Sequence, residues 1–195
     1  MSLPTSVTES EAPPAIARPV FGRSLLREIV ETLLLTAVIY GAVNLTTGRF
    51  RIEGPSMEPT LYQNERVVVD KVSYRLGDPR RGDIVVFNYP LATEKDFIKR
   101  VIGLPGDQID VVAGRVFVNG QELTEPYIFE APAYDDHRQL GPEQFYVLGD
   151  HRNSSSDSHN WGPLDRKYLI GRAVLIYWPP AAWGVVEHFT YNADP

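Results

Sequence analysis

The 195-residue sequence predicts an all-β domain preceded by one apolar helical segment. Two observations carry this prediction. Beyond Arg51, short runs of β-branched residues alternate with Gly and Pro turn signals, a pattern typical of antiparallel strands. Before Arg51, a long uncharged stretch has the character of a helix. With 43% hydrophobic and 23% charged residues, the chain has enough apolar surface to bury a core.

Composition excludes several classes of function. The formal net charge of −6 argues against a basic nucleic-acid binder. The absence of Cys excludes a disulfide framework, thiolate metal centres and a cysteine nucleophile. The sequence holds only four His and no HExxH motif, so metal-assisted hydrolysis has few candidate ligands. We therefore expect neither a metal nor another cofactor.

The first element is a polar N-terminal stretch, residues 1–22. It holds Pro4, Pro13, Pro14 and Pro19 among Ser, Thr, Glu and Ala. Such a mixture neither propagates a helix nor buries apolar surface. We expect a disordered tail here.

The second element is an apolar helix over residues 23–48. Thr32 to Gly48 carry no charge and would span roughly 26 Å as a helix, slightly less than a bilayer core of about 30 Å. The apolar residues among 25–30 can complete a membrane span. A buried core helix is an alternative, because one Arg and two Glu interrupt the first turns, and a cleaved signal peptide fits less well after so long a polar stretch. Basic residues flank both ends, so the positive-inside rule leaves the orientation open.

The remaining residues, 49–195, carry the strand signals. The turn signals are strongest at Ala113-Gly114 and at Asn119-Gly120, and the second of these is typical of a type I′ hairpin. Residues 121–145 are rich in Pro, Glu, Asp and Tyr, and we expect a small surface excursion there. The runs expected as strands are 66–72, 83–89, 96–102, 108–112, 115–118, 144–148 and 172–178.

The first candidate for chemistry is Ser56, in the stretch GPSMEPTL that follows the apolar segment and a short strand, FRIE. Pro55 and Pro59 bracket Ser56 and hold it on a rigid, non-helical turn. A nucleophilic Ser needs such exposure together with a base. Taken alone, such a stretch is more often an ordinary turn than a nucleophile site.

The second candidate is Lys99, because no His accompanies a nucleophile pattern. Strand alternation places Phe97, Lys99 and Val101 on one face, and Arg100 on the other between apolar neighbours. One of the two basic residues should therefore point toward an apolar surface. Burial lowers the pKa of a Lys, and a neutral amine can accept a proton from a Ser hydroxyl. The alternative is a solvated strand face.

A third candidate is the polar loop LGDHRNSSSDSHNWG, residues 148–162. Its Asp150, Arg152 and Asp157 can pair, and its serines can orient a neutral amine. Taken alone, it is a surface loop closed by Asp and Ser turn chemistry.

In order and together, these stretches resemble the sequence boxes of the bacterial type I signal peptidases. GPSMEPTL is similar to the nucleophile box of that family, RRGDIVVF and KRVIGLPGD to the next two, and GDHRNSSSDSHNWG to the last. The resemblance covers residues 24–180.

The resemblance implies a role for each matching residue. Ser56 corresponds to the nucleophile and Lys99 to the general base of a Ser/Lys dyad, and Ser155 to a serine that hydrogen-bonds the Lys amine. Arg100 and Asp150 correspond to a structural ion pair. Burial of Lys99 by its apolar neighbours should lower its pKa, with no need for a carboxylate of the two boxes that hold Ser56 and Lys99 to approach it.

Asp157 corresponds to an acid that pairs with a basic residue two positions later. Here that residue is His159, where the family often has Arg, so the pair should be weaker and pH-dependent. A second departure is Gly54, where some members have a Ser that helps to bind the oxyanion. The oxyanion hole should then depend mainly on the Ser56 backbone N–H and on another donor that the sequence does not reveal.

The resemblance also implies the activity and its setting. It implies a serine endopeptidase of the inner (plasma) membrane that removes signal peptides from exported preproteins after an Ala-x-Ala-like site. The tail would be cytoplasmic, one helix would span the bilayer, and two antiparallel sheets would form a coiled, barrel-like catalytic domain outside. The implied partners are preprotein signal peptides and the lipid bilayer, with no nucleic acid, and we expect a monomer. The apolar residues that match the substrate pocket are Phe50, Ile52, Met57, Leu61, Phe97 and Ile98.

Two other functions compete with this one. A self-cleaving SOS repressor also uses a Ser/Lys dyad, but residues 1–22 are too short and acidic for a DNA-binding domain, and Ala113-Gly114 has the pattern of a hairpin turn. The other is a membrane-tethered β-domain that only binds partners, and such a domain would not require Ser56 and Lys99 to lie close together.

Overall fold

The computed structural model describes residues 21–191, and the expected tail lies almost wholly outside this range. The chain divides into two compact units after Gly41. Helix α1 (Phe21–Thr46) forms the described part of the first unit and continues into the second, and it begins and ends two residues before the expected bounds. Its segment Leu25–Thr46 is long and apolar enough to cross a membrane and is not buried within the protein, although a signal sequence near an N-terminus has the same properties.

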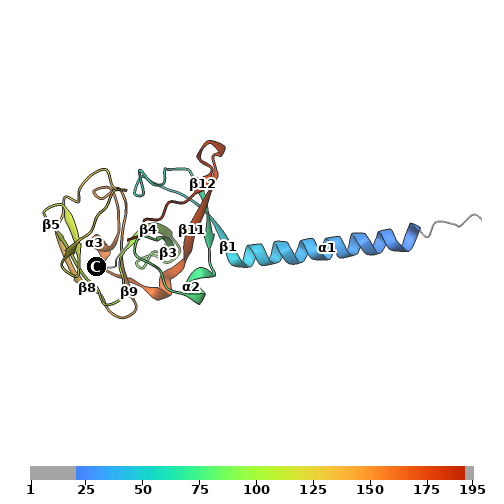
Figure 1. The fold of residues 1–195 in the computed structure, drawn as a ribbon, viewed down its shortest axis with the longest axis horizontal. Coiled ribbons are helices and arrows are strands. Elements are labelled where there is room, and N and C mark those ends of the chain that lie inside the picture. Colours follow the sequence, from blue (N-terminus) through green and yellow to red (C-terminus); the bar gives the residue numbers. More distant parts are fainter. Residues whose placement is uncertain (1–20, 192–195) are drawn as a thin grey trace, which may run out of the picture. The chain divides into compact units, whose positions relative to one another are not determined.

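The second unit contains a large antiparallel sheet, with strand order β1-β2-β11-β3-β4-β9-β10 and β12 beside β11 (Figure 1). Its long strand β11 carries register shifts that mark β-bulges, which increase the local twist of a sheet. The strands are β1 (Thr47–Arg51), β2 (Arg66–Asp70), β3 (Ile84–Asn88), β4 (Asp96–Gly103), β9 (Gln144–Leu148), β10 (Leu164–Asp165), β11 (Leu169–Trp178) and β12 (Gly184–Val185).

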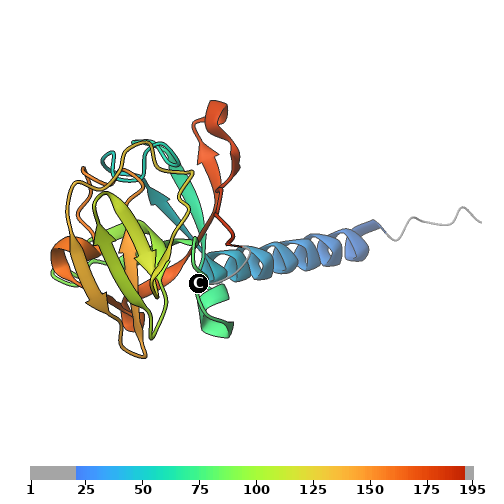
Figure 2. The same cartoon turned by 60° about the vertical axis from the view of Figure 1, so that its left-hand side comes forward.

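A smaller sheet has the order β7-β6-β5-β8, and its strands lie side by side in Figure 2. The strands are β5 (Gln108–Val112), β6 (Arg115–Val118), β7 (Gln121–Glu122) and β8 (Asp136–Gln139). Asn119 and Gly120 both have positive φ, as the type I′ hairpin requires, and so do Ala113 and Gly114. The all-β antiparallel fold class is confirmed.

Residues 121–145 are more than the expected surface excursion. They supply both edge strands of the smaller sheet, β7 and β8, and they bury Leu123 and Leu140 in its core. The sequence hides this because β8, with the residues DHRQ, is a polar edge strand without apolar alternation.

Apolar residues form separate cores that follow from the strand patterns. Nearly every residue of β3 is buried, as expected for a central strand packed on both faces. Alternating burial in β5 and β6 places one face of the smaller sheet against a core of its own. The large sheet therefore carries rigid, buried strands next to the residues expected to react.

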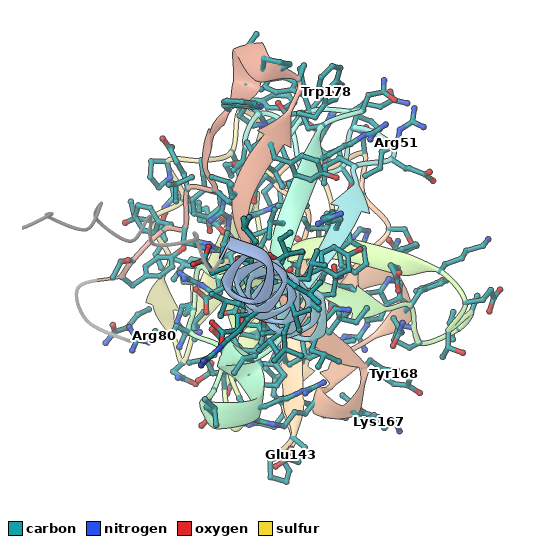
Figure 3. All side chains as sticks on the ribbon, turned by 90° about the vertical axis from the view of Figure 1, so that its right-hand side faces the viewer. Arg51, Arg80, Glu143, Lys167, Tyr168 and Trp178 are labelled. Carbon is teal, nitrogen blue, oxygen red and sulfur yellow. The ribbon has the colours of Figure 1, made fainter. Side chains whose placement is uncertain are left out.

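Short helices connect the strands: α2 (Ser73–Leu76), α3 (Ser158–Trp161) and the 3-10 turns η1 (Arg166–Tyr168) and η2 (Pro180–Ala182). Figure 3 shows Arg51 and Trp178 at one end of the sheet, and Lys167 and Tyr168 at the other. The register agrees, since Arg51 and Trp178 both lie opposite Arg66.

Candidate active site

Ser56 lies in the turn that joins β1 to β2. Two backbone hydrogen bonds tighten this turn, from Glu58 N to the Pro55 oxygen and from Leu61 N to the Met57 oxygen, both 2.9 Å long. Met57 and Leu61 are fully buried in the core beneath it. A third bond, from His151 N to the Ser56 oxygen at 3.2 Å, ties the turn to the polar loop 148–162. Packing on the core and the hydrogen bond to the polar loop therefore hold the turn of Ser56 in place.

Lys99 points at Ser56 from strand β4. Its Nζ lies 2.7 Å from Ser56 Oγ and 2.8 Å from the carbonyl oxygen of Ile98. The side chain is buried, with a residue exposure of 4%. The amine therefore lies within hydrogen-bond reach of the Ser56 hydroxyl, and it is buried as its apolar neighbours predict.

Burial lowers the pKa of the Lys99 amine from its ordinary value of 10.5 to about 8. Asp157 and then Asp150 oppose this shift and raise the pKa. Neither acid belongs to the boxes that hold Ser56 and Lys99. Both belong to the polar loop, which follows strand β9, the neighbour of β4 in the sheet. Desolvation still dominates, so a substantial fraction of the amine is neutral at mildly alkaline pH.

The neighbouring Arg100 forms a buried ion pair with Asp150. Arg100 Nε and Nη2 donate to the two Asp150 oxygens at 2.8 and 2.7 Å. Thr60 completes the cluster: its hydroxyl donates to Asp150 at 2.5 Å and accepts from Arg100 at 3.2 Å. Because Thr60 follows the Ser56 turn, the ion pair also anchors the far end of that turn. Such bidentate, charge-assisted bonds fix geometry well.

Asp157 organises the polar loop. One carboxylate oxygen accepts from Gly149 N at 2.9 Å, and the other accepts from the backbone N–H of His159, at the start of α3. His159 Nδ1 lies 2.7 Å from Asp157, so the expected pairing with the residue two positions later is present. The His159 ring stacks on Tyr134, with centroids 3.8 Å apart. The loop is thus fixed by caps and packing.

Ser155 lies where the loop meets the nucleophile turn. A Cβ added to Gly149 would collide with both the Ser155 side chain and the Ser56 carbonyl oxygen, so these three residues are in close contact. The Ser155 hydroxyl oxygen is buried and has no hydrogen-bond partner among residues 21–191. The expected bond from Ser155 to the Lys99 amine is not formed in this structure.

A cavity of about 750 Å³ opens beside the dyad. Of the expected substrate-pocket residues, Phe50, Ile52, Phe97 and Ile98 line it, whereas Met57 and Leu61 lie in the core and do not. Alternation along β1 and β4 could have indicated the lining strands, but not which residues lie beneath the turn. The lining residues that the sequence analysis missed are Arg49, Arg51, Glu53, Val86, Glu94, Lys95, Asp96 and Ser156.

Comparisons with known proteins show which family the chain resembles. The family model described as "Signal peptidase, peptidase S26" matches residues 25–178. A "Signal peptidase I" of Leptolyngbya laminosa is 44% identical over 181 residues, which cover 86% of this chain and 87% of that protein. A "Probable signal peptidase I-2" of a Synechocystis strain is 43% identical over 166 residues, covering 82% and 76%. A crystal structure of a signal peptidase I from Enterococcus faecalis V583 aligns with a TM-score of 0.46 and 26% identity, covering 49% of this chain and 97% of that one.

Proposed function

The chain belongs to the signal peptidase family, peptidase S26, and from this premise we propose that it is a membrane-bound serine endopeptidase that removes signal peptides by means of Ser56 and Lys99. Family membership makes the chain a type I signal peptidase and a hydrolase. The observation that supports the dyad is the 2.7 Å separation of Lys99 Nζ and Ser56 Oγ.

In the proposed reaction, neutral Lys99 accepts the proton of Ser56 as Oγ attacks the scissile carbonyl carbon. The ammonium then returns that proton to the leaving amine, and the new N-terminus of the mature protein departs. A water molecule, deprotonated by the same amine, hydrolyses the acyl-enzyme and restores Ser56. The low pKa of Lys99 suits both directions of proton transfer near pH 8.

The oxyanion would be bound by the Ser56 backbone N–H. Gly54 provides no side-chain donor, and its φ of +80° places it in the left-handed region. We assign Arg100, Asp150 and Asp157 the role of holding the nucleophile turn and the polar loop in place. Ser155 is proposed to orient the Lys99 amine, since its buried hydroxyl adjoins the turn of Ser56.

The substrate would bind as an extended strand in the cavity beside the dyad. Main-chain hydrogen bonds along β1 or β4 would fix its register, and the apolar lining by Phe50, Ile52 and Ile98 suits the small residues of an Ala-x-Ala site. The proposed setting is the inner (plasma) membrane, spanned once by α1, with the N-terminus cytoplasmic, the catalytic domain outside and the enzyme monomeric.

A fluorogenic peptide with an Ala-x-Ala site tests this proposal. We expect the full chain in detergent to cleave after the second Ala and Ser56→Ala to lose that activity, while Ser154→Ala, an exposed loop serine, keeps it. Cleavage by Ser56→Ala would contradict the nucleophile assignment. Failure of the wild type to cleave, with binding of the peptide retained, would favour a membrane-tethered binding domain instead.

A further inference from the structure

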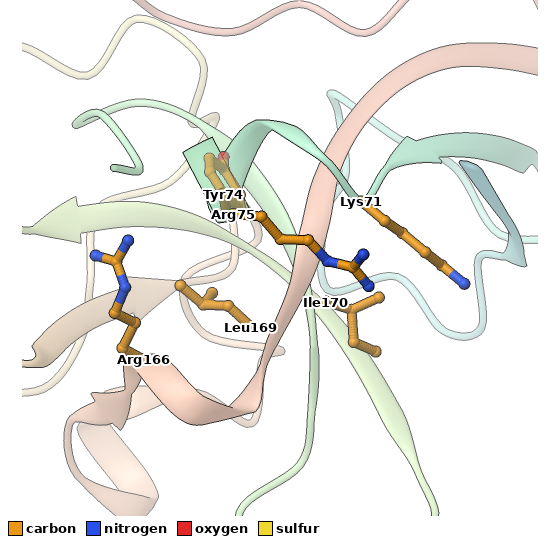
Figure 4. Close-up of a pocket in the computed structure, with 6 residues that line it drawn as sticks. All are labelled: Lys71, Tyr74, Arg75, Arg166, Leu169 and Ile170. Carbon is orange, nitrogen blue, oxygen red and sulfur yellow. The ribbon is translucent and has the colours of Figure 1, made fainter. Parts of the chain in front are cut away.

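A second cavity, of about 320 Å³, shares no lining residue with the cavity beside the dyad. Three of its lining side chains are cationic and come from different elements: Lys71 follows β2, Arg75 belongs to α2, and Arg166 belongs to η1. Figure 4 shows Lys71 and Arg75 extending in the same direction. Tyr74, Leu169 and Ile170 complete the lining.

Two of these cations have no counter-ion within the described part of the chain. Neither Lys71 nor Arg75 forms an ion pair there, in contrast to Arg166, which pairs with Asp78 and lies 3.9 Å from Glu143. Asp70, the acid nearest to Lys71 in the sequence, is occupied by the N–H groups of residues 72 and 73 and by the Ser73 hydroxyl. Two like charges that line one cavity in a chain of net charge −6 favour an anionic ligand.

The lining is also partly apolar. Leu169 and Ile170 begin strand β11 and are half-buried, and the Tyr74 hydroxyl is committed to Asp83 at 3.0 Å. A free inorganic anion gains nothing from two aliphatic side chains. An anion that carries an aliphatic portion would bury it there, so the mixed lining favours an amphipathic ligand.

The cavity lies where helix α1 ends. The carbonyl oxygen of Thr46, the last residue of α1, accepts a hydrogen bond from Lys71 N at 2.9 Å. The Lys71 stem packs over Gly48, since a Cβ there would lie 2.8 Å from Lys71 Cε. The end of a membrane span lies at the level of the lipid headgroups, so basic side chains at that level can contact lipid phosphate groups.

We propose that this cavity binds the phosphate group of an anionic membrane lipid. Lys71 and Arg75 donate charge-assisted hydrogen bonds to the phosphate oxygens, and Leu169 and Ile170 contact the start of an acyl chain. This site goes beyond the removal of signal peptides. It depends on the proposed insertion of α1 in a bilayer, but not on the dyad.

The test is retention of lipid by the full chain in a neutral detergent, measured by native mass spectrometry. The probes are phosphatidylglycerol and phosphatidylcholine with the same acyl chains. We expect the wild type to retain one phosphatidylglycerol in preference to phosphatidylcholine. The double variant Lys71→Gln/Arg75→Gln should bind it roughly 30-fold more weakly, because it loses both charge-assisted hydrogen bonds to the phosphate. The matched control Arg115→Gln/Arg138→Gln removes the same charge from β6 and β8 and should bind as the wild type does.

A competition experiment distinguishes binding of a lipid phosphate from binding of free inorganic phosphate. Inorganic phosphate at millimolar concentration should leave the bound lipid in place, and displacement at that concentration would overturn the assignment to a lipid. Equal retention of both lipids by the wild type would overturn it too, as would unchanged binding by the double variant. If the double variant does not fold, Arg75→Gln alone serves, because that side chain is exposed.

Peptide cleavage distinguishes failure of this site from failure of the proposed function. The double variant should cleave the Ala-x-Ala peptide in detergent at the wild-type rate. A wild type that cleaves the peptide but shows no lipid preference would contradict the lipid site alone.

Discussion

Lys99 and Arg100 are adjacent in strand β4, both are buried, and their environments are electrostatically opposite. Arg100 makes two hydrogen bonds to the Asp150 carboxylate, whereas Lys99 Nζ contacts a Ser hydroxyl and a backbone carbonyl. Burial lowers the pKa of Arg100, but the hydrogen bonds and charge of Asp150 raise it above its ordinary value. Burial lowers the pKa of Lys99 to about 8. One strand thus holds a permanent charge beside a titratable amine.

The first prediction is a pH profile. Because only neutral Lys99 accepts a proton, kcat/KM for an Ala-x-Ala peptide should rise about tenfold per pH unit below pH 8 and level off above about pH 9. Initial rates between pH 6 and pH 10 measure this. A profile that is flat over the range would contradict Lys99 as the base.

The second prediction concerns Lys99→Arg. Guanidinium stays protonated throughout this pH range, so the variant should lose at least about 10³-fold in kcat while keeping the positive charge. Lys167→Arg is the control, because that residue lies on the surface at the far end of the sheet. Cleavage by Lys99→Arg within tenfold of the wild type would exclude the proposed mechanism.

The third prediction is that Lys99→Met stabilises the protein. The folded-state pKa of about 8 lies below the ordinary 10.5, so between these values the unfolded chain binds more protons and stability rises with pH. At pH 7 the buried ammonium costs on the order of 3 kcal/mol. Lys99→Met should therefore raise the melting temperature by several degrees at pH 7, with a smaller gain at pH 10. Thermal unfolding of the variant and the wild type at both pH values measures these gains. A melting temperature of Lys99→Met below that of the wild type at pH 7 would contradict this prediction.

The fourth prediction concerns Gly149→Ala. The added Cβ would collide with the Ser56 carbonyl oxygen, and backbone at that point can yield only by moving the nucleophile turn. A displacement of about 1 Å can cost roughly 10²-fold in rate. We expect that loss in kcat with the fold retained, measured by peptide cleavage and circular dichroism. Gly77→Ala is the matched control, since its Cβ would meet nothing closer than 3.6 Å.

The fifth prediction is acid sensitivity caused by His188. Its Nδ1 accepts from Ile84 N and its Nε2 donates to the Ala173 oxygen, an arrangement that needs the neutral ring. Burial, and then Arg172, lower its pKa from 6.5 to about 4. Stability is therefore fully present above pH 6.5 and falls by about 2–3 kcal/mol as the pH drops to 4.

The variant His188→Asn cannot titrate and should lose less stability than the wild type between pH 6.5 and pH 4. The control is His137→Asn, whose ring is exposed, and denaturant unfolding at the two pH values gives the comparison. An equal loss of stability in the wild type and in His188→Asn would show that groups other than His188 cause the destabilisation at low pH.

Most strands could be predicted from sequence, because short runs of β-branched residues between Gly and Pro turns rarely form any structure other than a strand. Strands 115–118 and 144–148 have the expected bounds, and β11 begins three residues before the expected 172. The missed strands β10 and β12 are two residues long, and β8 is polar. Their pairing depends on partners distant in sequence, which no local pattern reveals.

The site was predictable only in part, for a similar reason. Alternation along β4 indicated that one of Lys99 and Arg100 faces an apolar surface, but both are buried, because the Asp150 carboxylate that neutralises Arg100 comes from a distant loop. The proximity of Ser56 to Lys99 followed from the family resemblance and not from spacing. The same limit explains why Met57 and Leu61 lie beneath the nucleophile turn and not in the cavity.

The order of strands in the large sheet has a consequence for how activity relates to shape. The Ser56 turn follows β1 and Lys99 lies on β4, and these strands are separated by β2, β11 and β3. In a flat sheet, four steps of about 4.8 Å would hold them roughly 19 Å apart. Their contact at 2.7 Å therefore requires two features together: the turn beyond β1, which carries Ser56 away from its strand, and a twisted sheet, to which the register shifts of β11 contribute. A substitution in β11 that reduces this twist would move Ser56 away from Lys99 and lower peptide cleavage while the strands stay paired.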